Sequence, residues 1–558
     1  MKNITKVFKV LNLINFKYKT NIFFFVILIL LNTLTELIGF GIIFPIIDLV
    51  LTNENQYNFN FFDKQIFFFD KKFEKSELLK ILTILLVFSF FFKFIFKLFF
   101  FYKIGKVFAD LKTKISSILI FKYLKMQYFN FQKTGQSAKI RNTINENQGF
   151  SKFYLNFIEI ISHLFFIIFL ILVISYFNIT IIKFTIIIIL IVLFLHQIFF
   201  KNRLKIAVTK RINLDGIIIK RITEIFNNYK ELKLTIKKSF FTDRLYLDLN
   251  NLNQQKFKIS FLSEILNPAF EFIFILFLGI TLYQLSNDNN IDIASKAPET
   301  VIVILALIRI FPSINRLIFL FQNLIKTSKS VNVIFEEILK EKDYKIDNNQ
   351  NFKFEKNLNT KSLSYKYSDT KKISFNITSN IKPNSVNLII GKSGVGKSTF
   401  LNILSGLLKP EGKIIIDDKE VDLFENKFWF DKIVYLSQNP FIFDDNLKNN
   451  ILMGSEYNEI EYKSIISICQ LDELDKLNSL GELSSTISGG QKQRVALARV
   501  LYSKKEFIMM DEPTNMLDYK NKEEFFEFIK KNKKNKTFFI VSHDKELTKI
   551  SDNIIEIS

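Results

Sequence analysis

Long apolar runs constrain this chain more than any other feature. Residues 21–50 read NIFFFVILILLNTLTELIGFGIIFPIIDLV, and residues 162–177 read SHLFFIIFLILVISYF. Both runs are longer than most strands or core helices of soluble domains, and their length suits the thickness of a bilayer. The chain of 558 residues is 49% hydrophobic with 66 Phe, and the apolar residues are clustered rather than evenly spread. The first half therefore predicts a membrane-embedded helical domain.

The apolar pattern and the basic residues together predict the membrane topology. Nine basic residues lie in 102–146 and fourteen in 201–258, whereas 286–298 contains a single Lys. Because cytoplasmic loops carry the excess of Lys and Arg, both termini and the two large loops are expected in the cytoplasm of a multi-pass bacterial inner-membrane protein. The N-terminal span is expected to be an uncleaved anchor. The expected spans are 21–50, 78–101, 153–177, 179–200, 259–285 and 299–325.

The net charge of +22 does not by itself predict a nucleic-acid partner. Only nine of the 76 basic residues are Arg, and the abundance of Lys, Asn, Ile and Phe indicates a genome-wide composition bias. Cytoplasmic loops of a membrane protein explain the charge, so no nucleic-acid partner is expected. The single cysteine, Cys469, excludes an intrachain disulfide.

The loop at 51–77 is unusually apolar for a connector, with the segment QYNFNFFDKQIFFFD at 56–70. One interpretation is an amphipathic segment that lies at the outer membrane surface. The other is a compact loop packed on the helix ends. A polar connector follows the sixth span, after which short β-rich runs and Gly-bearing turns predict a soluble α/β domain. The expected boundaries are 1–327 for the membrane domain, 328–350 for a linker and 351–558 for the second domain.

A phosphate-binding loop lies at the start of the second domain. The segment SVNLIIGKSGVGKSTFLNILSGL at 385–407 is an apolar strand, a Gly-rich loop and a helix, the context that G-x-x-x-x-G-K-[ST] requires. Glycines let backbone N–H groups approach phosphates, and the helix N-terminus favours their charge. Lys397 is expected to bridge the β- and γ-phosphates and Ser398 to bind Mg²⁺. The expected ATP-binding residues of this loop are Gly391, Lys392, Ser393, Gly394, Val395, Gly396, Lys397, Ser398 and Thr399.

A second apolar run, EFIMMDEPTNMLD at 506–518, ends in two carboxylates. Asp511 is positioned to hold Mg²⁺ through water, and Glu512 could take a proton from an attacking water molecule. These assignments gain weight from the segment ISGGQKQRVALARVL at 487–501 just upstream.

Together these motifs identify a resemblance to ABC transporters of the exporter type, which covers essentially the whole chain. It implies an α-helical six-span membrane domain followed by an α/β P-loop ATP-binding domain, with ATP and Mg²⁺ as cofactors. Ser488, Gly489, Gly490 and Gln491 match the signature motif, with Ile487 in place of the usual Leu. In the family this motif contacts the γ-phosphate of the nucleotide bound to the opposite subunit. A homodimer is therefore expected, with a heterodimer as the alternative.

The resemblance assigns further residues one at a time. Tyr367 corresponds to the aromatic residue that stacks on adenine; Tyr365 is the alternative, and either ring could instead be a strand-end core residue. Gln438 matches the Q-loop glutamine that senses Mg²⁺, and His543 matches the switch histidine. Asp518 is retained in a D-loop that reads NMLD instead of Ser-Ala-Leu-Asp. His163 and His196 are interpreted as packing or membrane-edge residues. Segments 123–146 and 221–244 resemble the intracellular coupling loops, the second of which docks on the partner's ATP-binding domain.

Two arginines lie within the sixth expected span, in LIRIFPSINRL at 307–317. Seven residues turn a helix by about 700°, so Arg309 and Arg316 share one face, roughly 10.5 Å apart along the axis. Three interpretations remain open. The pair binds an anionic substrate in a cavity; it pairs with intramembrane acids such as Glu36, Glu264 or Glu271 and only fixes packing; or Arg316 lies at the membrane edge of a long helix. Pro312 could open a kink, and Lys93 and Lys97 are further cavity candidates.

The cargo is predicted from a second resemblance. LIRIFPSINRL, GFGIIFPIIDLV at 39–50 and NYKELKL at 228–234 are similar to segments of lipid-linked oligosaccharide flippases. This resemblance implies ATP-driven flipping of a polyprenyl-pyrophosphate-linked saccharide, with membrane lipid around it and basic cavity residues receiving the pyrophosphate. A lipid or multidrug exporter is the alternative within the class. A membrane-tethered ATP-binding regulator without transport is the alternative outside it, and it has no need of Glu512.

Overall fold

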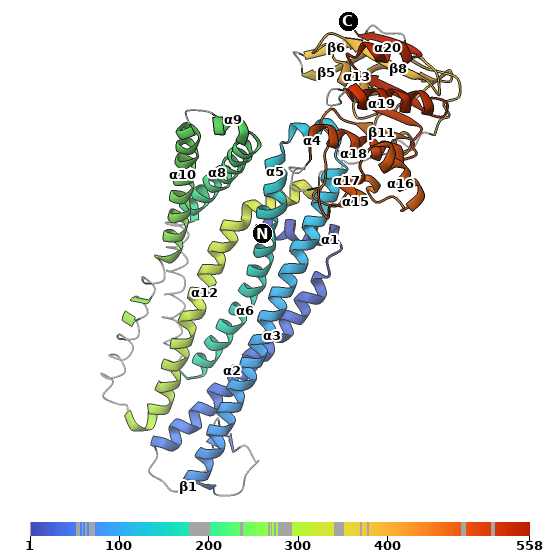
Figure 1. The fold of residues 1–558 in the computed structure, drawn as a ribbon. Coiled ribbons are helices and arrows are strands. Elements are labelled where there is room, and N and C mark those ends of the chain that lie inside the picture. The colour runs from blue at the N-terminus through green and yellow to red at the C-terminus, as the bar shows by residue number, and fades with distance from the viewer. Residues whose placement is uncertain are drawn as a thin grey trace. The chain divides into compact units, whose positions relative to one another are not determined.

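The computed structural model (Figure 1) describes 2–51, 56–57, 60–61, 64–65, 73–177, 201–234, 238–265, 268, 271–272, 275–276, 279, 293–339, 351–368, 371–375, 379–480, 487–514 and 519–557. The chain divides into two compact units. The first comprises Met1–Leu124 and Thr134–Glu341, and the second comprises Lys125–Lys133 and Lys342–Ser558.

The longest elements of the first unit are all helices. Two of its described helical stretches, Lys75–Leu124 and Gln136–Leu172, are long and apolar enough to cross a membrane. The expected spans 21–50, 78–101, 153–177 and 299–325 fall inside single helices; 179–200 lies outside the described residues, and 259–285 is described only in part. The helices are α1 (Lys2–Leu13), α2 (Tyr18–Leu51), α3 (Lys75–Leu124), α5 (Gln136–Arg141), the π-helix η1 (Asn142–Glu146), α6 (Asn147–Phe177), α8 (Lys201–Asn227), α9 (Tyr229–Leu234), α10 (Lys238–Glu264) and α12 (Ile293–Leu339).

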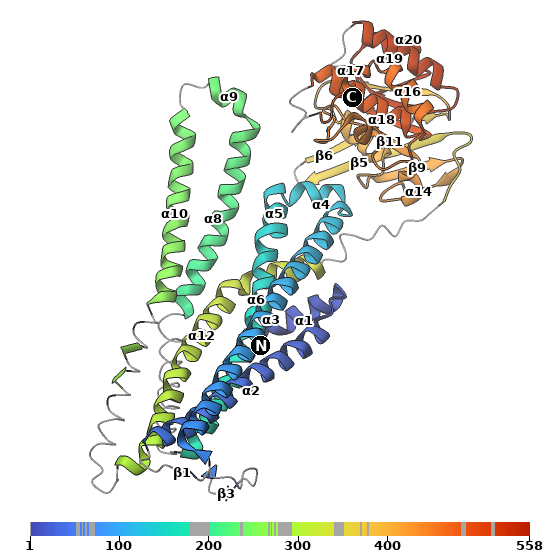
Figure 2. The same cartoon turned by 60° about the horizontal axis from the view of Figure 1, so that its bottom comes forward.

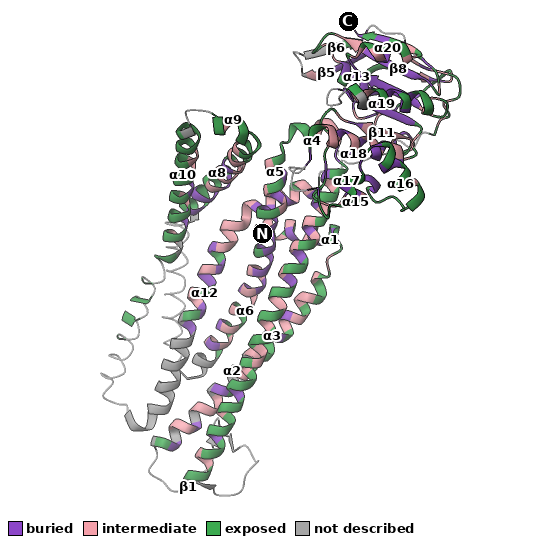
Figure 3. Ribbon diagram, in the orientation of Figure 1, coloured by how far each residue is buried: buried purple, intermediate pink, exposed green. Residues whose placement is uncertain are grey.

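Helix α3 changes character along its length. Its first half exposes apolar side chains such as Val87 and Phe94, as a lipid-facing surface requires, and Figure 3 shows this exposure along the helix. Further along, Val107, Leu111 and Ile115 recur every four residues and are buried, the period of a helix that packs on its neighbours. Helix α3 therefore has a lipid-facing segment that is followed by a segment packed against other helices.

Helix α12 packs along α6. Ile160 and Ile167 of α6 form an apolar cluster with Leu317 and Leu320 of α12. The two backbones approach closely at Gly149, where a Cβ atom would lie 2.3 Å from the hydroxyl of Ser330. α12 runs as one helix from Ile293 through Pro312 to Leu339. α8 and α10 lie side by side in both views (Figures 1 and 2) and share an apolar cluster that contains Leu204, Val208 and Ile259.

Between α2 and α3, the described parts of the 51–77 loop are short strands. β1 (Gln56–Tyr57) pairs with β4 (Phe73–Glu74), and β2 (Asn60–Phe61) pairs with β3 (Lys64–Gln65), both antiparallel. These pairs favour the compact loop over a helix at the membrane surface among the residues described there.

The second unit contains a parallel sheet with the order β11-β12-β13-β8-β14. Its strands β8 (Val386–Gly391), β11 (Ile433–Leu436), β12 (Phe507–Asp511), β13 (Thr537–Val541) and β14 (Asn553–Ile557) pair in parallel at every step. β13 is buried at all five positions, as expected for a strand covered on both faces. The helices around it are α13 (Lys397–Leu404), α14 (Lys427–Phe430), α15 (Leu447–Leu452), α16 (Glu459–Ile468), α17 (Asp472–Asp475), α18 (Gly489–Tyr502), α19 (Tyr519–Asn532) and α20 (Lys545–Ile550).

An antiparallel sheet packs beside it, with the order β10-β9-β5-β6 and β7 paired to β5. Its strands are β5 (Leu358–Ser368), β6 (Lys371–Phe375), β7 (Asn380–Ile381), β9 (Glu411–Ile416) and β10 (Lys419–Glu420). The main core of the unit joins both sheets around the fully buried Trp429, whose ring centroid lies 4.5 Å from that of Phe507. α4 (Tyr128–Lys133) also belongs to this unit, and Phe129 meets Tyr365 edge-on at 6.4 Å.

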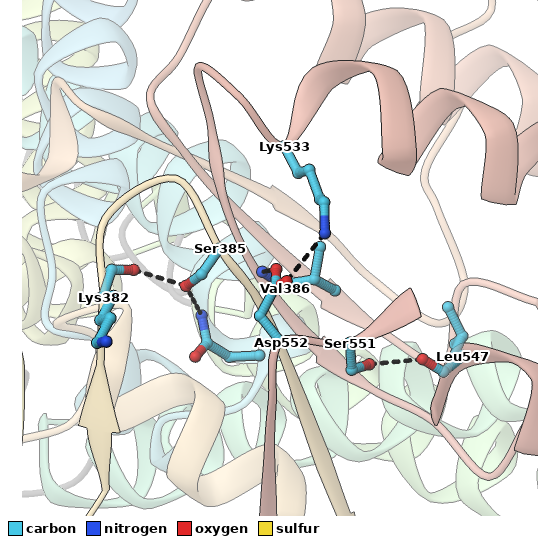
Figure 4. Close-up of polar contacts among 8 residues, drawn as sticks. Lys382, Ser385, Val386, Lys533, Leu547, Ser551 and Asp552 are labelled. Carbon is cyan, nitrogen blue, oxygen red and sulfur yellow. Dashed lines mark hydrogen bonds and ion pairs between the residues drawn. The ribbon is translucent and has the colours of Figure 1, made fainter. Parts of the chain in front are cut away.

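Polar contacts fix the amino ends of β8 and β14 (Figure 4). Asp552 accepts from the backbone N–H of Val386 at 2.9 Å and from Lys533 at 2.9 Å. Burial alone would raise the pKa of Asp552, but these two bonds outweigh it and hold the pKa below its usual value. Ser385 donates to the carbonyl of Lys382 at 2.6 Å in the preceding turn. The strand that leads into the phosphate-binding loop is thereby anchored at its start.

The buried amide of Asn450 in α15 generates a first prediction. Its Nδ2 atom donates to the carbonyls of Phe443, Asp445 and Asn446, and its Oδ1 atom accepts from the N–H of Phe443 and from Arg499. Asn450→Leu leaves these buried groups unpaired, so we expect a local stability loss of about 3 kcal/mol. Hydrogen exchange of residues 441–452 in the full chain should become faster. The exposed neighbour Asn449→Leu is the control, and equal exchange in the two variants would contradict this role.

Candidate functional site

The phosphate-binding loop begins where β8 ends and stops at the first residue of α13. Gly396 precedes the helix with a φ of 113°, a conformation that a side chain disfavours. A Cβ atom at Gly391 would lie 2.3 Å from the carbonyl of Ile557, so the close approach of β14 also requires glycine. Lys397 turns back over the loop and donates to the carbonyls of Gly391 at 2.8 Å and Lys392 at 3.2 Å. Two backbone carbonyls of the loop therefore hold the ammonium group of Lys397 in place.

The loop follows β8, and residues at the carboxyl ends of β11, β12 and β13 lie around it. Asp511 ends β12, Glu512 follows it, and His543 lies two residues beyond β13. Gln438 follows β11 in the same way. Together they border a cavity of about 350 Å³, which is lined by Tyr367, Ile373, Ser393, Gly394, Gly396, Lys397, Ser398, Thr399, Gln438, Asp511, Glu512, Val541 and His543. Val395 instead packs against the core.

The donor set in this cavity fits Mg²⁺. Burial raises the pKa of Asp511, while a hydrogen bond with Ser398 and the charge of Lys397 oppose that rise. Gln438 lines the same cavity and contributes an amide oxygen. Among the residues described, no three or more His, Cys, Asp or Glu form a metal-binding group. A hydroxyl, a carboxylate and an amide suit Mg²⁺, which takes few protein ligands and keeps water and phosphate oxygens.

Glu512, the expected general base, lies on the wall of this cavity. Its φ of 50° lies in the left-handed region, which is strained for a residue with a side chain. Its Oε1 atom lies 3.6 Å from Nε2 of His543, which in turn lies 2.9 Å from Nζ of Lys397. Its Oε2 atom is buried and has no hydrogen-bond partner in the described part of the chain. Among the described residues no donor therefore stabilises the charge on this oxygen, which favours its taking up a proton.

The environment of Glu512 also changes its titration. Burial raises the pKa of this carboxyl, and the charges of His543 and Lys397 work against that rise. A raised pKa brings a carboxylate closer to the operating pH, where it is a better general base.

Two tyrosines were candidates for adenine stacking, and the structure distinguishes them. Tyr367 lines the nucleotide cavity, and its hydroxyl lies 2.9 Å from that of Thr399. Tyr365 is 8% exposed and packs in the core of the domain. The two rings meet edge-on with centroids 4.8 Å apart. The position of Tyr367 on the cavity wall supports it as the stacking residue.

The signature residues form a helix cap away from this cavity. Ser488 caps α18: its side chain accepts from the N–H of Gln491 at 3.2 Å, and its own N–H donates to the Gln491 side chain at 2.8 Å. Ser488, Gly489, Gly490 and Gln491 are all described, yet none of them lines the cavity that holds Lys397. Gln493 of α18 donates to the carbonyl of Gln438 at 3.1 Å, which links the signature helix to the Q-loop. Asp518 lies outside the described residues.

A second cavity, of about 480 Å³, lies in the helical unit. Lys93 and Lys97 of α3 and Arg316 of α12 border it together. Glu159 and His163, one turn apart on α6, complete its charged and titratable lining. The structure therefore brings three of the four proposed substrate residues to one cavity. The side chain of Arg309 lies outside what the structure describes.

The partner of Arg316 was not predicted. Its Nη2 atom lies 2.6 Å from Oε2 of Glu159, and its guanidinium lies 5.2 Å from the ring centroid of Phe319. Glu36, Glu264 and Glu271 were the acids considered from the sequence, and none of them is this partner. His163, expected to be a packing or membrane-edge residue, lies on the cavity wall. A Glu and a His four residues apart in an apolar span were the signal that could have identified both.

Comparisons with known proteins agree with this geometry. Residues 374–515 match the family described as ABC transporter. The chain is 33% identical over 208 residues to ATP-dependent lipid A-core flippase 1 of Colwellia psychrerythraea, covering 36% of this chain and 35% of that protein. It is 27% identical over 346 residues to the ATP-dependent lipid A-core flippase of Wigglesworthia glossinidia brevipalpis, covering 60% and 59%.

Exporters of other cargo are similar to the same degree. The microcin-J25 export ATP-binding/permease protein McjD of Escherichia coli is 33% identical over 205 residues, 35% of each chain. These alignments span between about a third and three fifths of the relatives' lengths. A solved bacterial Atm1-family ABC exporter with ATP bound has a TM-score of 0.80 at 16% identity and covers 97% of this chain and 94% of that one. The fold is therefore that of an ABC exporter.

The position of Tyr367 gives a prediction for nucleotide affinity. Tyr367→Ala should raise the Kd for ATP about tenfold, because stacking of a base on an aromatic ring contributes about 1–3 kcal/mol. Tyr367→Phe keeps the ring and should bind ATP nearly as well as the wild type. Tyr365→Ala should mainly lower thermal stability. Fluorescent ATP titration with unfolding curves measures both effects, and a larger affinity loss for Tyr365→Ala would reverse the assignment.

The environment of Glu512 gives a prediction for pH dependence. The base must be ionised to accept a proton, so ATP hydrolysis should fall as pH decreases through the raised pKa of Glu512. The acid limb of the rate should therefore lie above the ordinary range of a carboxyl group. Glu512→Gln should lower hydrolysis by about 10²–10⁴-fold above this acid limb, where the wild-type carboxylate is ionised, while ATP still binds. Glu506→Gln, an exposed carboxylate upstream on the same segment, is the control. Equal hydrolysis by Glu512→Gln and wild type would exclude the base.

Proposed function

This chain has the fold of an ABC exporter and an ABC transporter ATP-binding domain, and from that premise we propose that it couples ATP hydrolysis to the flipping of an anionic lipid-linked saccharide. The leading cargo is a polyprenyl-pyrophosphate-linked saccharide. The proposed setting is the bacterial inner membrane, with several spans and both termini in the cytoplasm.

The ATP-binding part of the proposal follows from the cavity beside α13. Lys397 and the loop amides bind the phosphates, Tyr367 stacks on adenine, and Ser398, Gln438 and Asp511 hold Mg²⁺. Mg²⁺ supplies charge neutralisation on the phosphate oxygens. Glu512 takes the proton of the attacking water, and His543 faces the γ-phosphate position from the end of β13.

A symmetric homodimer is the proposed assembly. The signature residues do not line the phosphate cavity of their own chain, although the N-terminus of α18 is suited to bind an anion. A site that needs both elements requires a second ATP-binding domain. Two copies of this chain provide two such sites by two-fold symmetry. A heterodimer with a related half-transporter is the alternative, and the mass of the purified complex distinguishes them.

One observation carries the cargo proposal: Lys93, Lys97 and Arg316 border a single cavity among membrane helices. Charged side chains are costly inside a bilayer and are retained there mainly to bind ions or substrates. Arg forms paired hydrogen bonds with phosphate oxygens, and flanking Lys residues add point charges. The similarity to proteins named lipid A-core flippases supports a lipid cargo.

The alternatives predict different cavities or different chemistry. A multidrug or neutral-lipid exporter does not require three cations on one cavity wall. A tethered regulator without transport does not require a strained, buried carboxylate beside the phosphate loop. The peptide exporters among the relatives leave peptide cargo as an outcome of the transport assay.

The cargo proposal predicts a charge-dependent transport defect. Arg309→Ala with Arg316→Ala should lower the flipping of a fluorescent polyprenyl-pyrophosphate saccharide in proteoliposomes by about tenfold or more, because a hydrogen bond to a charged group contributes about 1.5–3 kcal/mol. Basal ATP hydrolysis should change little. Arg203→Ala, an exposed residue of α8, is the matched control. Absence of flipping by wild type, or equal flipping by the double variant, would reject the pyrophosphate cargo.

A further inference from the structure

We propose that Glu159 is an internal counter-ion of Arg316 that the anionic group of the cargo displaces. This inference rests on the proposed function, because it assigns a new role within the same cavity. Glu159 thereby becomes a positioning residue that sets how tightly an anion binds and how readily it leaves.

The contact between the two side chains is short and directional. Arg316 on α12 donates from Nη2 to Oε2 of Glu159 on α6 at 2.6 Å. The Glu159 side chain is 16% exposed, whereas the Arg316 side chain is 42% exposed, and both line the cavity. The carboxylate therefore covers part of a guanidinium that otherwise faces the cavity.

The charges around the cavity make Glu159 distinctive. Among the described residues that line it, Lys93, Lys97 and Arg316 are cationic, and Glu159 is the acid. These described side chains, three cations and one carboxylate, leave a formal excess of two positive charges. A group with two or more negative charges, such as a pyrophosphate, offers more complementary charge than one carboxylate and can form paired bonds with the guanidinium. The cavity therefore favours exchange of Glu159 for such a group.

A third cavity, of about 840 Å³, offers the displaced carboxylate other cations. Glu159 borders both this cavity and the one that contains Arg316. Lys152, Lys256 and Lys326 also line the third cavity. Its arginine, Arg211, already has a carboxylate, since Nε lies 3.5 Å from Asp215. The side chain of Glu159 thus has cations on both sides, which limits the cost of leaving Arg316.

Glu159 and the anionic group compete for Arg316, and this competition lowers the apparent affinity of the cavity for the anion. If Glu159 holds Arg316 for all but about a tenth of the time, the apparent affinity for an anion is about tenfold weaker than the intrinsic one. The same competition assists release, because the carboxylate returns as the anion leaves. Glu159 therefore weakens the binding of the anion and speeds its release.

The test uses full-length protein in liposomes and a fluorescent polyprenyl-pyrophosphate saccharide as the probe. Glu159→Gln keeps the size of the side chain and removes its charge. We expect an apparent KM for flipping about tenfold lower than that of the wild type, together with a lower maximal rate. Glu159→Asp keeps the charge on a shorter side chain and should remain close to the wild type. Glu224→Gln, an exposed acid of α8 paired with Lys220, is the matched control.

The outcomes separate this inference from the proposed function. A lower KM with a lower maximal rate in Glu159→Gln, at unchanged thermal stability, supports the counter-ion. An unchanged or higher KM in Glu159→Gln, with flipping by the wild type and loss in Arg316→Ala, overturns the counter-ion but keeps the cargo. If Glu159→Gln fails to fold, a KM for Glu159→Asp above that of the wild type overturns it as well. No flipping by the wild type rejects the cargo and, with it, this inference.

Discussion

The parallel pairing of β11, β12, β13 and β8 is the constraint on which the nucleotide site depends. Parallel strands align their carboxyl ends at one edge, so segments far apart in the sequence deliver side chains to one place. Asp511 ends β12, and Gln438, His543 and the phosphate loop follow β11, β13 and β8. Because β8, β12 and β13 are buried along most of their length, each of these apolar runs must end before its polar residue can act. Hydrophobic burial therefore positions the chemistry.

The membrane unit satisfies a comparable constraint by different means. A charge among apolar helices needs a partner, and α6 supplies it to α12 across 157 residues of sequence. The two helices are held in register by apolar packing and by the close approach at Gly149. The position of Glu159 opposite Arg316 is thus a result of helix packing. In both units, apolar contacts determine where the charged groups meet.

Motifs with fixed spacing predicted most of the residues that border the cavity beside α13, because the loop from Gly391 to Thr399 is local in sequence and its neighbours follow from strand order. Glu159 could have been identified as an acid within an apolar span, but its pairing with Arg316 depends on the register between two helices, which no local pattern specifies. Tyr365 and Tyr367 were also ambiguous, since residues two apart on a strand face the same side. A register shift between Lys366 and Ser368 accompanies their separation into core and cavity positions. The local sequence patterns did not predict the contacts that depend on long-range packing.

The two cavities share one physical principle. Lys397 is held by the carbonyls of its own loop and by His543, and Arg316 is held by Glu159. An incoming phosphate must therefore replace an existing partner in either place, so the free energy of binding is a difference between two sets of contacts. A ligand that replaces a partner also releases it, and the released His543 or Glu159 side chain is then available for a new contact. Ligand binding at either cavity can thereby alter the structure around it without a separate sensor.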